Sequence, residues 1–415
     1  MQESMASLIP NPFGSLQGVR ILSTGSIIAQ PFAAAMAAEM GAEVIQLERP
    51  GQGDALWRNI EFPIKGENGN SVAAGWVQAR RNSFHATLDL STTRGREMFL
   101  GMIPKVDIWM ESSIPGTYDE WGLDDETVLN ANPKLVVAHV SGYGQYGHPD
   151  YLKRASYDFI GQAFGGLMNL TGLPDPDPPV RAAPWTGDFI TALFCLWSSL
   201  AGYINAQRTG KGQVIDLAQY EAIHHILSGT MVAYNELGLN RERSGNAAGL
   251  AQPYDSYQAS DRWVVVAGVG NVFDRVCGVL GLEPVDPYWR PAATEVDSPV
   301  GIEFDAVMRG WVLGHTVKEV VEAMNAAQVG CTSIMTPEDM AKDPHYQARD
   351  MHIEWNDISL GRTVKGVGIT PKFSDTPGQI WRGSVPLGYD NELVYQHYLG
   401  LSPTELEPLK NQGVI

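Results

Sequence analysis

Short apolar runs alternate with stretches of helical periodicity through the first 140 residues of the chain. Short buried strands separated by helices are typical of a parallel, doubly wound sheet. The clearest unit is Leu16–Glu48, which reads as a strand, a crossover helix that ends at Gly41, and a second strand. We therefore predict an α/β fold with ligands beyond the carboxyl ends of its strands. The apolar runs are Val19–Leu22, Val44–Leu47, His85–Leu88, Val106–Met110 and Leu135–Val140.

The second half of the chain predicts a smaller α+β domain. A long helical stretch follows Asp188 and ends at Gly210, and another runs from about Leu217 to Gly238. Strand and helix patterns then continue from Trp263 to Met335, and extended segments follow. We place the first part of the large domain at 1–210, a linker helix at 211–240, the small domain at 241–335, and a linker with a part returning to the large domain at 336–415.

Composition excludes several classes of partner and site. The 415 residues are 44% hydrophobic and 18% charged, as in an ordinary globular enzyme, and the net charge of -18 disfavours nucleic acid and anionic membranes. We expect a cytoplasmic protein, because we find neither a secretory signal nor an apolar run long enough to cross a membrane. The three cysteines lie far apart, so we expect no metal site.

Two other patterns suggest chemistry that we consider less favoured. Gly142–Gly147 matches a dinucleotide fingerprint after an apolar strand, which keeps an NAD-dependent dehydrogenase open as an alternative. The residues that follow do not begin an apolar helix, and no acidic ribose ligand is evident, so a plain glycine-rich loop is the favoured interpretation. His224 and His225 are adjacent on a helical stretch and point about 100° apart, which is unsuitable for a metal pair.

Charged residues near expected element ends are the better candidates. Asp188 lies directly before the long helical stretch, where it can be a helix N-cap. The helix dipole would hold such a carboxylate ionised, which suits a nucleophile that attacks acyl groups, so the two roles are compatible. Arg49 and Arg81 lie near expected strand ends, where each can bind a phosphate group or face solvent.

Several short segments occur in the order that they have in the family III CoA-transferases, and the chain resembles that family over nearly its whole length. Within the family it is similar to the carnitine CoA-transferase branch, through Thr186–Asp188, Pro371–Phe373 and Pro377–Gly383. Benzylsuccinate CoA-transferase subunits are also similar. The segments are Gly18–Leu22, Gly41–Pro50, Gly53–Asp54, Asn132–Val136, Ser141–Gly147, Ala155–Asp158 and Gly187–Asp188.

The resemblance implies a fold and a site. Two chains would be threaded through each other like linked rings, each with a Rossmann-like large domain built from both ends of the chain and a small domain between long linkers. Asp188 falls on the family's catalytic aspartate, Arg49 on an arginine that binds a CoA phosphate, and Tyr143 on a tyrosine that lines the pocket. We take Arg81 as a further candidate for binding CoA.

The activity implied is transfer of CoA from an acyl-CoA donor, such as succinyl-CoA, to an organic carboxylic acid through an aspartyl-CoA thioester. CoA esters are then substrates, and no metal or prosthetic group is needed. Ile114, Glu120 and Trp121 stand where relatives often have cationic CoA contacts. This departure favours a heteromer of the benzylsuccinate type, while a carnitine-type homodimer, a dimer of dimers and a purely structural subunit stay open.

Overall fold

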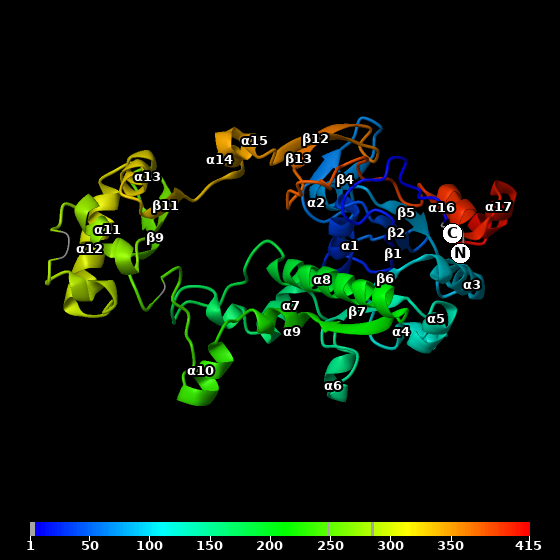
Figure 1. Cartoon of the computed structure of the whole chain (residues 1–415), viewed down its shortest axis with the longest axis horizontal. Helices are drawn as coiled ribbons and strands as arrows, with labels where there is room; N and C mark the ends of the chain where they lie inside the picture. The colour runs from blue at the N-terminus through cyan, green and yellow to red at the C-terminus, as the bar shows by residue number, and fades with distance from the viewer. Residues whose placement is uncertain (1–4, 248, 284–285) are drawn as a thin grey trace. The chain divides into compact units, whose positions relative to one another are not determined.

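The structure is a computed structural model that describes residues 5–247, 249–283 and 286–415. Its contacts divide the chain into two compact units (Figure 1). Unit 1 combines the chain up to Leu167 with Ala182–Ser228 and Ala348–Ile415, and unit 2 combines Met168–Arg181 with Gly229–Gln347. Unit 1 is therefore assembled from three separate stretches of sequence, and it contains the residues that the sequence singled out for chemistry.

A parallel sheet of six strands forms the centre of unit 1. Its order is β5-β2-β1-β6-β7-β8, so successive strands extend the sheet first on one side of β1 and then, from β6, on the other. This is the Rossmann order, and the predicted α/β fold is confirmed. The strands are β1 (Arg20–Ser23), β2 (Glu43–Glu48), β5 (Phe84–Thr87), β6 (Ile108–Glu111), β7 (Val136–Ser141) and β8 (Gln213–Ala218).

Helices cover both faces of this sheet, which explains why its inner strands read as continuous apolar runs. On one face α1 (Ala29–Glu39) and α8 (Thr186–Thr209) pack against each other and against the strands. Small residues of both helices, such as Ala34 and Ala192, allow this close packing. The core on this face is therefore built largely from alanine and valine side chains.

The other face is covered by helices from both ends of the chain. Here α3 (Thr93–Met102) and α5 (Asp125–Ala131) are joined by α16 (Asn391–Leu399) and α17 (Pro403–Asn411). Helix α16 packs on β5 and α3, and its Tyr395 hydroxyl donates a hydrogen bond of 2.6 Å to the carbonyl of Thr87. The C-terminal segment thus completes the core that the N-terminal strands begin.

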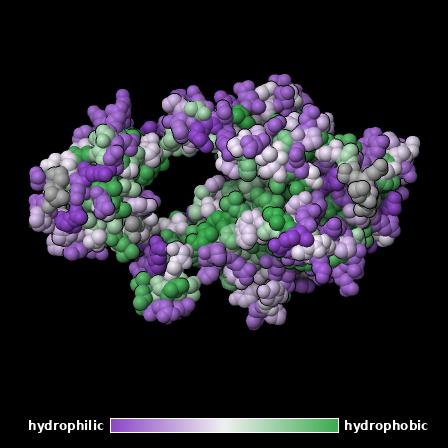
Figure 2. All heavy atoms as spheres, viewed as in Figure 1, coloured by the Kyte–Doolittle hydropathy of each residue, from purple (hydrophilic) through white to green (hydrophobic). Residues whose placement is uncertain are grey.

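Helix α8 has a buried and an exposed apolar face. By length and composition alone it could cross a membrane, which the search for apolar runs in the sequence did not anticipate. Its inner face, with Thr191, Cys195 and Ser199, is buried within unit 1. Leu193, Trp197 and Ile204 are exposed on the outer face, and Figure 2 shows apolar side chains gathered along this helix.

The range 211–240, expected to be a linker helix, holds β8 and two helices. The other elements of unit 1 are β3 (Pro63–Lys65), β4 (Ser71–Ala73), α2 (Ala74–Ala79), α4 (Thr117–Glu120), α6 (Pro149–Leu152), α7 (Asp158–Phe164), α9 (Gln219–His225), β12 (His352–Asp357) and β13 (Arg362–Val367).

Unit 2 has an antiparallel sheet of order β11-β10-β9, with helices packed around Phe273 and Phe304. Its strands are β9 (Tyr254–Gln258), β10 (Trp263–Ala267) and β11 (Gly330–Ser333). Its helices are α10 (Thr230–Leu237), α11 (Phe273–Val279), α12 (Pro299–Leu313) and α13 (Val317–Ala326), and α14 (Pro337–Lys342) and α15 (Pro344–Ala348) follow.

Candidate active site

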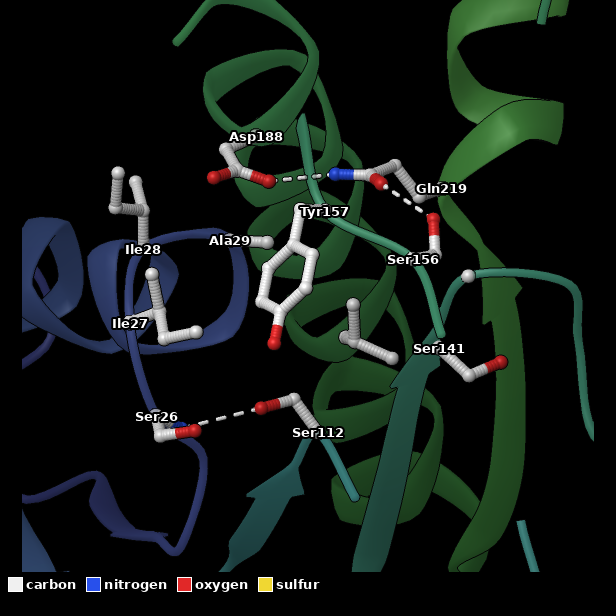
Figure 3. A pocket seen from close by; sticks show the side chains of 12 residues that line it. Ser26, Ile27, Ile28, Ala29, Ser112, Ser141, Ser156, Tyr157, Asp188 and Gln219 are labelled. Carbon is white, nitrogen blue, oxygen red and sulfur yellow. Dashed lines mark hydrogen bonds between the residues drawn. The ribbon is translucent and has the colours of Figure 1, made fainter. Parts of the chain in front are cut away.

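A pocket of about 110 Å³ lies at the point where the strand order of the sheet reverses, and we call it the aspartate pocket (Figure 3). Open α/β sheets bind ligands at this switch point, beyond the carboxyl ends of the strands. Ser26 comes from the loop after β1, Ser112 from the loop after β6, and Ser141 from the end of β7. Asp188 of α8 and Gln219 of α9 complete the polar lining.

The loops around this pocket approach each other closely. A side chain at Gly142 would place its Cβ atom 2.3 Å from Cβ of Ser156, so only glycine lets the loop after β7 contact the segment before α7. The backbone N–H of Ser26 donates to Oγ of Ser112 at 3.2 Å, which joins the loops after β1 and β6. The Tyr157 side chain extends across the pocket between these loops and Asp188.

Asp188 is held in the first turn of α8 and is not the N-cap that the sequence suggested. The cap position is Trp185, which makes no capping hydrogen bond through its side chain. The backbone N–H of Asp188 donates to Oδ1 of Asp158 at 3.1 Å, and Nε2 of Gln219 donates to Oδ1 of Asp188 at 2.5 Å. Gln219 in turn accepts from the Ser156 hydroxyl at 3.4 Å.

The electrostatics of Asp188 also differ from the expectation of a carboxylate held ionised by the helix dipole. Burial raises the pKa of Asp188 to about 7, and the nearby charge of Asp158 acts in the same direction. The hydrogen bond from Gln219 opposes both effects. The carboxylate can therefore ionise at neutral pH and is less strongly solvated than one in water, which increases its reactivity as a nucleophile.

A second pocket of about 220 Å³, the arginine pocket, lies beside Arg49. Arg49 directly follows β2 and is exposed, as a residue that binds a ligand phosphate must be. Thr24 and Ser113 line this pocket, and the nearby Ser26 and Ser112 line the aspartate pocket. The loops that follow β1 and β6 thus contribute residues to both pockets.

The other two predicted binding residues lie elsewhere. Arg81 precedes β5, at the amino ends of the strands, where its buried guanidinium pairs with Glu39 and donates to the carbonyl of Val367 at 2.7 Å. This position speaks against a CoA contact, and we leave Arg81 out of the proposed site. Tyr143 follows β7 and packs its ring against Phe164 and Tyr151, beside the aspartate pocket and not in its lining.

Sequence reasoning missed the two residues that contact Asp188. Asp158 belongs to the segment Ala155–Asp158, which pointed to the family without indicating a role. Gln219 begins α9 directly after β8, and no local sequence signal marks it. Within the described ranges, no group of three or more His, Cys, Asp or Glu side chains is arranged to hold a metal ion.

Comparison with known proteins identifies the family. The model of CoA-transferase family III matches residues 16–391, so this chain belongs to that family and is a CoA-transferase. The bile acid CoA-transferase BaiK of Clostridium scindens is 37% identical, over 97% of this chain and 90% of its own. The succinyl-CoA–D-citramalate CoA-transferase of Chloroflexus aurantiacus is 33% identical, over 96% of this chain and 98% of its own.

A solved structure agrees with the family assignment. The CaiB/BaiF family protein of Brucella suis has a TM-score of 0.81 and is 27% identical, with 93% of this chain and all of that chain covered. Family membership replaces the dehydrogenase alternative that Gly142–Gly147 had kept open. In the structure this loop leads into the four-residue helix α6 and not into the long helix that a dinucleotide site needs.

Proposed function

We propose that the chain transfers CoA between carboxylic acids through a covalent thioester on Asp188. The observation that carries this proposal is the position of Asp188, which lines the pocket at the switch point and is fixed through one carboxylate oxygen by Gln219. Because Oδ1 accepts that hydrogen bond, we assign nucleophilic attack to Oδ2. A carboxylate positioned in this way suits acyl transfer, which proceeds without a change of oxidation state.

The proposed reaction has four steps. Oδ2 of Asp188 attacks the donor carbonyl, the C–S bond breaks, and a mixed anhydride and CoA thiolate form. The thiolate attacks the Asp188 carbonyl, which gives the aspartyl-CoA thioester and releases the donor as a carboxylate. An acceptor carboxylate then attacks this thioester to give a new anhydride and the thiolate. Attack of the thiolate on the acceptor carbonyl yields the product acyl-CoA and regenerates the Asp188 carboxylate.

We assign the CoA phosphates to the neighbourhood of Arg49. The guanidinium can form charge-assisted hydrogen bonds with a phosphate, each worth about 1.5–3 kcal/mol. From there the pantetheine arm would pass along Thr24 and Ser113 toward Ser26 and Ser112, which places the thioester near Asp188. In this scheme the CoA ester supplies the thiolate and the acyl group, and Asp188 supplies the attacking carboxylate.

A second chain would complete the CoA site. Among the described residues that line the arginine pocket, Arg49 is the one cation, beside the acidic Glu48 and Asp89. Trp121 lies in this lining, and Ile114 is exposed nearby in the chain. Both side chains are uncharged, so neither provides the positive charge that a phosphate needs. We therefore propose a partner of the same fold, in a heteromer, that contributes cationic groups. The exposed apolar face of α8 supports association with another chain.

The central test is replacement of Asp188 by asparagine, with Asp375→Asn as a control at an exposed carboxylate. Wild-type protein is incubated with an acyl-CoA and hydroxylamine, and peptides are analysed by mass spectrometry. We expect a hydroxamate on Asp188, and we expect Asp188→Asn to lose activity by a factor of about 1000 or more. Full transfer by Asp188→Asn, or a hydroxamate on another residue, would show that the assignment is wrong.

The heteromer has its own test, in which the chain is expressed alone and with a homologous chain. We expect weak affinity of the lone chain for acyl-CoA esters and a gain on co-expression. Full turnover by the lone chain, as a homodimer, would refute the heteromer and leave the role of Asp188 unaffected.

A further inference from the structure

A third pocket, of about 290 Å³, adjoins the aspartate pocket, and we call it the apolar pocket. The two pockets share Ile27, Ile28, Tyr157 and Asp188, so the carboxyl group of Asp188 lies at their boundary. An acyl group attached to Asp188, or a carboxylate that attacks it, therefore has the apolar pocket beside it. The apolar pocket has about twice the volume of an apolar cavity of about 150 Å³ that holds a benzene molecule.

The lining of this pocket is aromatic and aliphatic. Trp57 is buried, while Leu56 and Phe159 are partly exposed at its surface. Trp185 contributes its ring, because its Nε1 atom is already engaged in a hydrogen bond of 3.0 Å to Glu61. Ring faces of this kind pack well against flat or bulky apolar groups.

Charge in the apolar pocket is limited to carboxylates. The described residues that line it include Asp158 and Asp188 and no lysine, arginine or histidine. A second carboxylate on a substrate would lose water there without gaining a cationic partner, and it would face the charge of Asp158. The carboxylate of the acceptor that attacks Asp188 does not meet a like charge there, because the Asp188 side chain is uncharged while it is part of the thioester.

We propose that the apolar pocket binds the acyl tail and selects monocarboxylic acids with an uncharged, ring-bearing tail over dicarboxylic acids. This inference rests on the proposed function, in which donor and acceptor acyl groups occupy the same place beside Asp188 in turn. It therefore applies to both substrates, and it makes succinyl-CoA a poorer donor than an arylalkanoyl-CoA. Burial of one phenyl group predicts a preference of about 10- to 150-fold.

Binding to the unreactive Asp188→Asn chain tests this selectivity separately from catalysis. The dissociation constants of 3-phenylpropionyl-CoA and glutaryl-CoA are compared by titration calorimetry, because the shared CoA part cancels in their ratio. We expect the phenylpropionyl ester to bind at least tenfold more tightly. Equal binding of the two esters, or tighter binding of glutaryl-CoA, would overturn the inference whether or not the wild-type chain is active.

A parallel turnover assay separates the two proposals. If wild-type chain shows no transfer and no modification of Asp188 while the binding preference is present, the proposed function is wrong and the pocket still selects apolar tails. If transfer occurs with dicarboxylic acids preferred, the proposed function holds and the selectivity is wrong.

Substitutions at the pocket surface give a second, matched comparison. Leu56→Arg introduces a cation beside the acyl tail, and it should reduce the preference for the phenylpropionyl ester by tenfold or more. Leu393→Arg is the control, because Leu393 and Leu56 are both 45% exposed and Leu393 lies on α16, outside the apolar pocket. Phe159→Ala, at a residue that is 51% exposed, should weaken binding of the phenylpropionyl ester alone. An unchanged ratio in both pocket variants would refute the assignment.

Discussion

Replacement of Asp188 by asparagine should stabilise the protein at alkaline pH while it removes activity. The structure buries the carboxyl group beside Asp158, and burial raises the pKa of Asp188 from 3.8 to about 7. An asparagine keeps a carbonyl oxygen that can accept from Gln219, so the local hydrogen bond is retained. The substitution therefore removes the cost of ionising a buried group without creating a cavity.

The magnitude follows from the difference between the pKa values of the folded and the unfolded chain. Each pKa unit corresponds to about 1.36 kcal/mol, so a shift of about three units sets an upper limit of about 4 kcal/mol. Below pH 4 the carboxyl group is protonated in both states and the cost vanishes. It grows as the pH rises, because only the unfolded chain releases the proton, and it is complete above pH 7.

The assay is urea unfolding of wild type and Asp188→Asn at pH 5 and pH 8, followed by tryptophan fluorescence. We expect the free energy of unfolding of the variant to exceed that of wild type, with a larger difference at pH 8. Asp375→Asn removes a charge from an exposed loop residue and should leave the difference near zero at both pH values. A variant that is less stable than wild type at pH 8 would refute the reasoning.

Three further predictions concern activity. The kcat/KM of wild type should fall tenfold per pH unit well below pH 7, where Asp188 is protonated. Asp158→Asn should move this fall to lower pH, because it removes a like charge beside Asp188. An unchanged pH profile in this variant would contradict the role of Asp158. Gln219→Ala should lower kcat by about 10- to 100-fold through loss of the bond to Asp188, and near-normal kcat would rule out this positioning role. Arg49→Ala should raise KM for CoA esters about tenfold with kcat preserved, whereas Arg208→Ala, at the exposed end of α8, should behave as wild type.

The part of the fold that the sequence predicts well is the part with buried strands. All five apolar runs overlap strands closely, namely β1, β2, β5, β6 and β7, because a strand covered on both faces must be apolar throughout. Strand β8 was missed for the opposite reason. It is an edge strand with exposed Gln213 and Val214, so its composition lacks that signal.

For the candidate site, the sequence could indicate single residues but not the contacts between them. Asp188 and Arg49 are charged residues at element ends, and both line pockets beyond the carboxyl ends of strands. Arg81 shares that local pattern, yet it lies at the other ends of the strands, a difference that only the strand order reveals. Gln219 and the apolar pocket depend on segments far apart in the chain, which no local pattern brings together.

The return of α16 to the N-terminal sheet has a consequence for synthesis on the ribosome. Strands β1 to β8 are made first, and the segment Gly229–Gln347 of unit 2 follows before α16 is made. The roughly 170 residues from Gly229 to Leu399, the end of α16, take about 9–34 s to make at roughly 5–20 residues per second, and during this time the apolar surface of β5 and α3 is uncovered. Tyr395 and Tyr398 of α16 are fully buried in that core once it closes. The nascent chain thus exposes an apolar sheet face during this interval, and transiently exposed apolar surface of this kind is prone to aggregation.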